Sequence, residues 1–161
     1  MFNKIISGGQ AGVDRAALDV AIANRIAHGG WCPRGRKAED GTIDGRYALR
    51  ETDTEDYRVR TEWNVHDSDA TLVVCAGPPT GGTALTIDFA RAHGKAWYLL
   101  NMNEQHDISL LLEWLNANNI GILNIAGPRE SNCRGIYEKS RVLLQELVDR
   151  AGINGERRSR S

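Results

Sequence analysis

Cysteine is scarce in this chain, and long hydrophobic runs are absent. Of the 161 residues only three are cysteines, Cys32, Cys75 and Cys133, and none of them share the Cys-x-x-Cys spacing of a redox or zinc site. The odd number and wide separation of these thiols predict reduced cysteines in a cytoplasmic protein. No apolar run approaches the length that spans a bilayer, so we expect no membrane partner.

An excess of one charge is also absent. The 20 basic and 21 acidic residues give a formal net charge of −1, which offers no argument for nucleic acid as a partner. The four histidines are scattered without metal-ligand spacing, so we expect no protein-ligated metal. The first residues lack the layout of a signal peptide. The chain also has no Gly-x-Ser-x-Gly elbow and no Walker A lysine, which argues against ordinary ATP hydrolysis.

Glycine, by contrast, is concentrated in turns that lead from apolar runs into helical patterns. The first such turn, Gly8-Gly9-Gln10-Ala11-Gly12, lies before a helical pattern that starts at Asp14. A helix N-terminus presents free N–H groups and a partial positive charge, which suit a phosphate or another oxyanion. A tight turn without a ligand is the alternative. Asp14 also fits a purely structural role as a cap or first-turn acid.

A second glycine-rich turn, from Gly77 to Thr83, follows the most apolar run of the chain. Apolar runs predict strands at Met1–Ser7, Ile26–Trp31, Ala70–Cys75, Lys95–Leu100 and Ile122–Ala126. Helical spacing predicts helices at Asp14–Asn24, Thr54–Asp67, Ala84–His93, Ser109–Asn118 and from Gly135 to about Arg150. We expect one domain over residues 1–151 and a polar, frayed tail over residues 152–161.

The alternation of strands and helices predicts the α/β class. The expected architecture is a three-layer, Rossmann-like open parallel sheet of about five strands in the order 2-1-3-4-5. In that order the first and third strands are neighbours. Both glycine turns then open on one crevice, where open parallel sheets bind their ligands.

A long polar segment over residues 31 to 47 carries a cluster of cations that includes Arg34 and Arg36. Arginine offers a planar fork suited to phosphate, although a solvated charge run is the structural alternative. We therefore expect backbone N–H groups of the two turns, the Thr80 and Thr83 hydroxyls and these arginines to hold an oxyanion. The candidate ligand-binding residues are Gly8, Gly9, Gln10, Ala11, Gly12, Val13, Asp14, Arg34, Arg36, Thr80, Gly81, Gly82 and Thr83.

Several motifs in order along the chain also resemble a known family. They are Gly8-Gly9-Gln10-Ala11-Gly12-Val13-Asp14-Arg15, Gly30-Trp31-Cys32-Pro33-Arg34-Gly35-Arg36, Ala38-Glu39-Asp40-Gly41, Arg60-Thr61-Glu62-Trp63-Asn64-Val65, Asp67-Ser68-Asp69, Gly81-Gly82-Thr83 and Ala126-Gly127-Pro128-Arg129-Glu130-Ser131. They resemble the molybdenum-cofactor carrier family, which looks like a branch of the SLOG superfamily of lysine-decarboxylase-like nucleotide-binding proteins. The resemblance implies a Rossmann-like fold, an anionic ligand such as a nucleotide or the molybdenum cofactor, and oligomers.

One departure from the superfamily bears on chemistry. Its hydrolytic members carry a Gly-Gly-x-Gly-Thr-x-x-Glu signature, and aligning its Gly-Thr pair with Gly82-Thr83 puts Thr86 at the glutamate. Asp88 lies two residues further, on a different face of the helix. The carboxylate that would serve hydrolysis of a nucleotide derivative is therefore missing at its place.

The leading hypothesis is a protein that binds a phosphate-bearing, nucleotide-like ligand or the molybdenum cofactor. One alternative is a hydrolase or transferase acting on a nucleotide derivative, with Asp14, Glu39 or Asp40 as the acid or base. Another is a regulatory protein that has lost its ligand. Trp63, Trp97 and Trp114 lie on or beside predicted elements near the far half of the sheet, and this concentration of aromatic residues leads us to expect a homo-oligomer.

Overall fold

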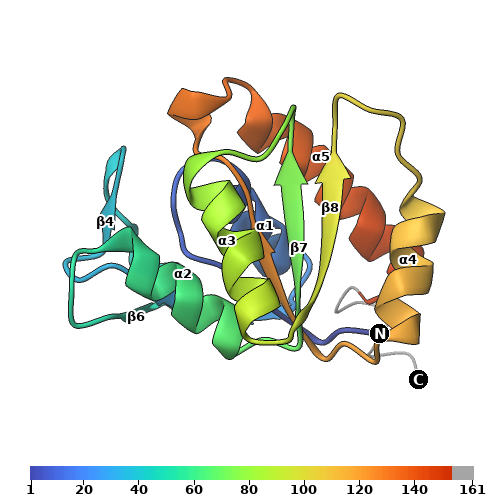
Figure 1. Cartoon of the computed structure of the whole chain (residues 1–161), viewed down its shortest axis with the longest axis horizontal. Coiled ribbons are helices and arrows are strands. Elements are labelled where there is room, and N and C mark those ends of the chain that lie inside the picture. Colours follow the sequence, from blue (N-terminus) through green and yellow to red (C-terminus); the bar gives the residue numbers. More distant parts are fainter. Residues whose placement is uncertain (154–161) are drawn as a thin grey trace.

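The computed structural model describes residues 1–153 and is built around a five-stranded parallel sheet (Figure 1). The sheet strands are β1 (Lys4–Ile6), β2 (Ala27–Gly29), β7 (Ala70–Cys75), β8 (Ala96–Asn101) and β9 (Ile122–Ala126). The helices are α1 (Val13–Ala23), α2 (Tyr57–His66), α3 (Gly81–Ala92), α4 (Ile108–Ala117) and α5 (Ile136–Ala151), with a short 3-10 helix η1 (Glu130–Asn132). The predicted α/β class and the parallel sheet are confirmed.

Helices cover both faces of the sheet, as Figure 1 shows for α3 on the near side and α1 and α5 on the far side. Helices α1 and α5 pack against each other, and so do α2 and α3. The side chains of β7 alternate between the two layers: Ala70, Leu72 and Val74 join the main core with α1, α4 and α5. Every residue of β7 is buried, as expected for a central parallel strand covered on both faces, and its one polar side chain, Thr71, accepts a hydrogen bond from Asn124 of β9.

The strand order is β2-β1-β9-β7-β8, which differs from the predicted order 2-1-3-4-5. Strand β9, the last of the five along the chain, pairs in parallel with both β1 and β7 and so separates them. Counting the five strands from β7 onward and passing from β9 to β1 gives the order 2-1-3-4-5. The doubly wound arrangement is therefore present, but β1, the first sheet strand along the chain, is the fourth strand of that count.

The polar segment after β2 is folded. It forms two short ladders, one between β3 (Trp31–Cys32) and β6 (Arg50–Glu51) and one between β4 (Lys37–Ala38) and β5 (Gly41–Thr42). Its apolar side chains make a second, small core with Leu18 of α1. We call this folded segment, residues 31–51, the flap; it lies beside the carboxyl end of β1.

The last described residues belong to the core rather than to a tail. Gly152 ends α5 in a left-handed conformation, and Ile153 packs into the main core with 8% of its surface exposed. The core therefore extends beyond the boundary predicted at residue 151. The rest of the predicted tail, residues 154–161, lies outside the described residues.

Candidate anion-binding site

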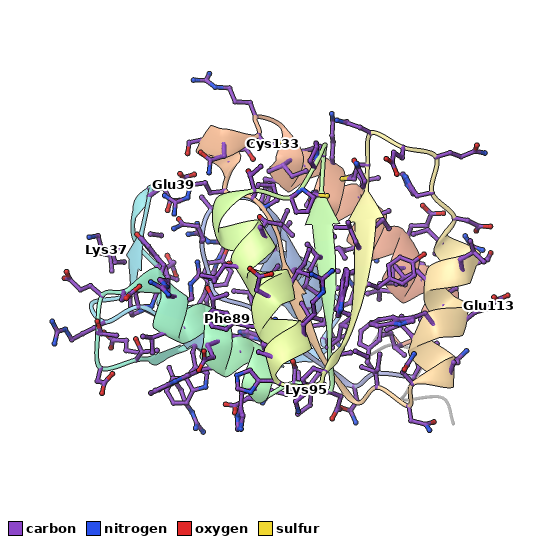
Figure 2. All side chains as sticks on the ribbon, in the orientation of Figure 1. Lys37, Glu39, Phe89, Lys95, Glu113 and Cys133 are labelled. Carbon is purple, nitrogen blue, oxygen red and sulfur yellow. The ribbon has the colours of Figure 1, made fainter. Side chains whose placement is uncertain are left out.

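A cavity of about 360 Å³ opens at the carboxyl ends of the central strands. Its walls come from the residues after β1, β7 and β9, from the first two turns of α3 and from one side of α2. Figure 2 shows Glu39 and Cys133 at this end of the molecule and Lys95 at the opposite end of the sheet. The two glycine turns therefore share a crevice, although β9 lies between their strands.

The N-terminus of α3 presents unused donors to this crevice. Thr80 is the N-cap residue, and its carbonyl accepts the N–H groups of Thr83 and Ala84. In the described part of the chain the N–H groups of Gly81 and Gly82 have no hydrogen-bond partner. A side chain at Gly82 would meet no atom within 4 Å, so the space in front of this turn is open. Such a helix end is suited to an anion.

The N-terminus of α1, in contrast, is partly occupied by the protein itself. The N–H of Val13 donates to the carbonyl of Pro128 at 3.3 Å, and the N–H of Gln10 donates to the Asp14 carboxylate at 3.4 Å. A Cβ at Gly12, whose φ is +108°, would lie 2.5 Å from the Pro128 carbonyl oxygen. A Cβ at Gly9 would lie 2.6 Å from the Leu49 side chain. These two glycines permit close packing of the β9 loop and of the flap.

A buried ion pair forms the floor between the two turns. The Arg60 guanidinium of α2 crosses over Gly8 and donates to the Asp14 carboxylate at 2.9 Å, with 13% and 5% of the two side chains exposed. Burial raises the pKa of the Asp14 carboxyl, and the charge and hydrogen bond of Arg60 oppose that rise. Arg60 also has a buried Nε without a hydrogen-bond partner among the described residues.

Two further arginines line the cavity and give it positive charge. Arg58 extends from the first turn of α2, and Arg129 comes from the loop after β9. The ring of Tyr57 lies 5.6 Å from the Arg60 guanidinium carbon and 5.3 Å from that of Arg129. Cation–π contacts of this kind hold the guanidinium groups at the cavity wall. With Asp14 as the single lining carboxylate among the described residues, cations outnumber anions in the site.

The predicted site residues divide into two groups. Those that line the cavity are Gly8, Gln10, Asp14, Thr80, Gly82 and Thr83. Those that do not are Gly9, Ala11, Gly12, Val13, Arg34, Arg36 and Gly81. Sequence reasoning missed Tyr57, Arg58, Arg60 and Arg129 as site residues. The sequence signal that could have identified Arg60 and Arg129 is their place in two of the motifs that resemble the family.

The predicted arginines of the flap serve its fold. Arg36 donates hydrogen bonds to the carbonyls of Ile43, Asp44, Tyr47 and Leu49, at 2.7 to 3.3 Å. Arg34 donates to the Asp53 carbonyl at 3.2 Å. With its guanidinium used by four backbone acceptors, Arg36 ties one end of the flap to the other instead of reaching the cavity.

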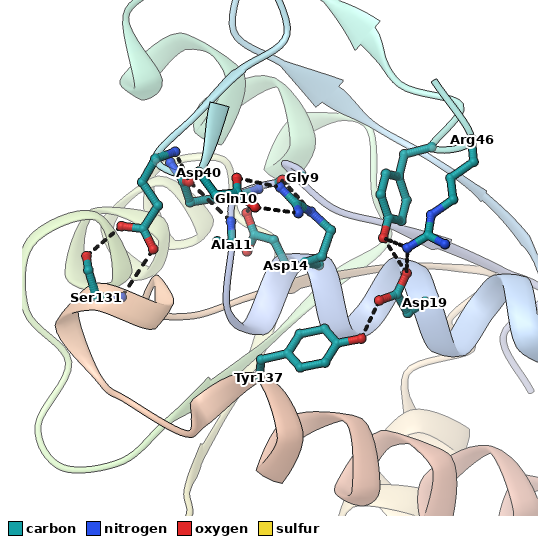
Figure 3. Close-up of polar contacts among 12 residues, drawn as sticks. Gly9, Gln10, Ala11, Asp14, Asp19, Asp40, Arg46, Ser131 and Tyr137 are labelled. Carbon is teal, nitrogen blue, oxygen red and sulfur yellow. Dashed lines mark hydrogen bonds and ion pairs between the residues drawn. The ribbon is translucent and has the colours of Figure 1, made fainter. Parts of the chain in front are cut away.

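The candidate acids of the flap are also held in place by the protein (Figure 3). The Glu39 carboxylate accepts hydrogen bonds from the N–H and the hydroxyl of Ser131, at 3.1 and 2.5 Å. Arg15 donates to both oxygens of Asp40 and lowers the pKa of that carboxyl. These contacts fasten the flap to α1 and to the loop after β9, outside the cavity.

Thr86 occupies the position of the glutamate in the hydrolytic signature, and its hydroxyl is already hydrogen-bonded within its own helix. The Thr86 hydroxyl donates to the Gly82 carbonyl at 2.9 Å, and Asp88 is exposed and does not line the cavity. Within residues 1–153 no group of three His, Cys, Asp or Glu side chains is placed to hold a metal ion. No helix of that range has both the length and the apolar character needed to cross a bilayer.

Comparison with known proteins identifies the family. The model of the circularly permutated YpsA SLOG family matches residues 5–148. The chain belongs to this family. A circular permutation agrees with the strand order, in which the doubly wound sheet is complete when counting starts at β7.

A solved structure is similar over nearly the whole chain. It is the crystal structure of the protein named "Putative molybdenum carrier protein" from Syntrophus aciditrophicus SB, with 43% sequence identity and a TM-score of 0.90. The match covers 91% of this chain and 95% of that one. No curated protein matches the chain.

Proposed function

We propose that this protein binds a small phosphate-bearing molecule in the cavity and serves as a carrier of the molybdenum cofactor. The observation that carries the proposal is the open N-terminus of α3: the Gly82 N–H has no partner among the described residues, and Gly82 lines the same cavity as Arg58, Arg60 and Arg129. Free backbone donors and guanidinium groups are the usual partners of a phosphate.

The similarity to a protein named as a molybdenum carrier supports the choice of cargo. That cofactor is a pterin bearing a phosphate, so it has the anion that the α3 terminus suits. A cavity of about 360 Å³ is within the usual size of small-molecule sites. The expected cytoplasmic location and homo-oligomer belong to the same proposal. Native mass spectrometry of the purified protein tests the cargo, because a bound cofactor adds its mass.

Calorimetric titration with inorganic phosphate, nucleotides and molybdate tests the location of the anion. The variant is Gly82→Val, and the matched control is Gly45→Val, since both glycines are exposed and have open space at the Cβ. We expect Gly82→Val to weaken phosphate binding about tenfold or more, equal to about 1.4 kcal/mol, and Gly45→Val to leave it unchanged. Binding that survives in Gly82→Val but is lost in Arg34→Ala would place the site in the flap and contradict the proposal.

A second candidate is hydrolysis or group transfer on a nucleotide derivative. Asp14 favours it, because a buried carboxyl with a raised pKa lines the cavity. Turnover of a nucleotide panel that disappears in Asp14→Asn supports this candidate. Binding without turnover supports the carrier.

A further inference from the structure

The floor of the cavity contains an amide donor without a partner. Gln10 is 5% exposed, and its Oε1 accepts the N–H groups of Ala11 and Glu39 at 3.1 and 2.7 Å. Because two N–H groups meet this oxygen, the orientation of the amide is determined. The Nε2 end is buried and has no hydrogen-bond partner among the described residues. A buried donor without an acceptor is costly, so this group is suited to an acceptor from a ligand.

The same cavity also contains an acceptor. Asp14 also lines the cavity, and its Oδ2 receives both the Gln10 N–H and the Arg60 guanidinium. Its Oδ1 accepts none of the hydrogen bonds of the described residues. The 3.4 Å hydrogen bond from the Gln10 main-chain N–H to Asp14 Oδ2 links the two residues, and both line the same cavity. The cavity lining thus includes one amide donor and one carboxylate acceptor that come from the same turn.

We propose that Gln10 and Asp14 together recognise the lactam edge of a bicyclic heterocycle, with Gln10 Nε2 donating to the ring carbonyl and Asp14 Oδ1 accepting from the ring N–H and the adjacent amino group. This inference rests on the proposed function, since the phosphate of the same ligand binds at α3. A 2-amino-4-oxopyrimidine ring presents this order of acceptor, donor and donor. Guanine and the pterins share that ring.

The other amides of the cavity cannot take this role as readily. Asn64 uses its oxygen to accept the Trp31 N–H and its nitrogen to donate to the Trp31 carbonyl. The Asn124 nitrogen donates to the Thr71 hydroxyl at 3.2 Å. Asn132 also lines the cavity but is exposed, so Gln10 is the buried lining amide whose donor has no partner within the part of the chain described. A ligand with an amino group in place of the carbonyl would face Gln10 with donor against donor.

Two pairs of probes test this recognition by calorimetry. One pair is guanosine 5′-monophosphate and 2,6-diaminopurine riboside 5′-monophosphate. The other is pterin-6-carboxylate and 2,4-diaminopteridine-6-carboxylate. Within each pair the exocyclic oxygen is replaced by an amino group and the neighbouring ring nitrogen loses its hydrogen, so the edge presents donor, acceptor and donor instead of acceptor, donor and donor. We expect the oxo member of at least one pair to bind about tenfold or more tightly, because a buried polar group rejects a mismatched partner. The pair that discriminates also tells a guanine ligand from a pterin.

The matched variant is Gln10→Glu, which keeps an oxygen for the Ala11 and Glu39 N–H groups and replaces the donor by an acceptor. We expect it to remove or sharply reduce the preference for the oxo member, because the new carboxylate oxygen repels the ring carbonyl and accepts from the amino group, whereas Asp14 still favours the ring N–H of the oxo member. Any general repulsion of anions weakens both members equally. Titration with inorganic phosphate measures that general effect. The comparison of probes in the unchanged protein stands alone if the variant does not fold.

The outcomes separate the two proposals. Equal affinity for both members of each pair, or an unchanged preference in folded Gln10→Glu, overturns the recognition by Gln10 and Asp14. If inorganic phosphate still binds in that case, the anion site at α3 survives. If neither phosphate nor any of the four probes binds, the proposed function fails together with the inference.

Discussion

Gly8 is the position where one added carbon should break the floor of the site. A Cβ at Gly8 would lie 1.6 Å from Arg60 Nη1 and 2.7 Å from Arg60 Cζ, far inside van der Waals contact. The φ of Gly8 is outside the left-handed region, so alanine can adopt the backbone conformation of this position. The effect of Gly8→Ala therefore acts through the displacement of the Arg60 guanidinium.

The size of the effect follows from the ion pair that is lost. Arg60 and Asp14 are 2.9 Å apart, and displacing the guanidinium leaves the buried Asp14 carboxylate without its cation. Removing one partner of a buried pair costs about 3–5 kcal/mol. We expect about 3 kcal/mol for Gly8→Ala, since the displaced guanidinium can move into the adjacent cavity instead of vanishing. In a domain of this size that loss lowers the melting temperature by about 6–12 °C.

A double-mutant cycle with Arg60→Ala, measured by urea unfolding, isolates this mechanism. Without the guanidinium, the nearest atom to the new Cβ is Asp14 Oδ2 at 3.0 Å. We therefore expect Gly8→Ala to cost less than about 1 kcal/mol in the Arg60→Ala background, a strong departure from additivity. The control is Gly12→Ala, whose Cβ would meet the Pro128 backbone at 2.5 Å and whose cost should be similar with or without Arg60. Equal costs of Gly8→Ala in both backgrounds would refute this account of Gly8.

Two further predictions concern stability at high pH and assembly. Burial and the hydrogen bond to Asp19 raise the pKa of Tyr137 to about 12 (Figure 3). Because the folded-state pKa is raised, the contribution of Tyr137 to stability is full below about pH 10, the pKa of an unfolded tyrosine, and falls as the pH rises toward 12. An ultraviolet titration of the folded protein should show one tyrosine that ionises late, and Tyr137→Phe should remove that signal. Persistence of the signal would assign it to another tyrosine. Strand β8 is at the edge of the sheet, and its Leu99 is 38% exposed. If the expected homo-oligomer forms through this edge, Leu99→Lys should give the monomer mass by light scattering. An unchanged oligomer mass would exclude this edge as the interface.

The central strands could be predicted from sequence because burial on both faces demands continuous apolar runs. The predicted ranges Ala70–Cys75 and Ile122–Ala126 coincide with β7 and β9. The flap was harder, because its order depends on contacts that no local pattern reveals. Arg36, with its four backbone acceptors, looked in the sequence like a free cation beside a loop. In a sequence, an arginine exposed to solvent cannot be told from one that binds backbone carbonyls until its hydrogen-bond partners are known.

The strand order shows a different limit. Hydrophobic pattern and helix alternation predict a doubly wound sheet, but they do not say at which strand the chain enters it. The assumption that the first strand is also the first of the winding put β1 next to β7. Permuted entry leaves the packing of the five strands unchanged, since parallel pairing and right-handed crossovers depend on neighbours in space.

The same permutation explains why the two glycine turns have different work. Counted from β7, the point where the winding reverses lies between β7 and β9, and ligands of open sheets bind at that point. The turn after β7 therefore opens α3 onto the crevice, where the Gly82 N–H has no partner among residues 1–153. The turn after β1 lies one strand away, and its Val13 and Gln10 N–H groups donate to the Pro128 carbonyl and the Asp14 carboxylate. The phosphate of the proposed function therefore belongs at the second turn, and the first turn contributes side chains to the floor of the cavity.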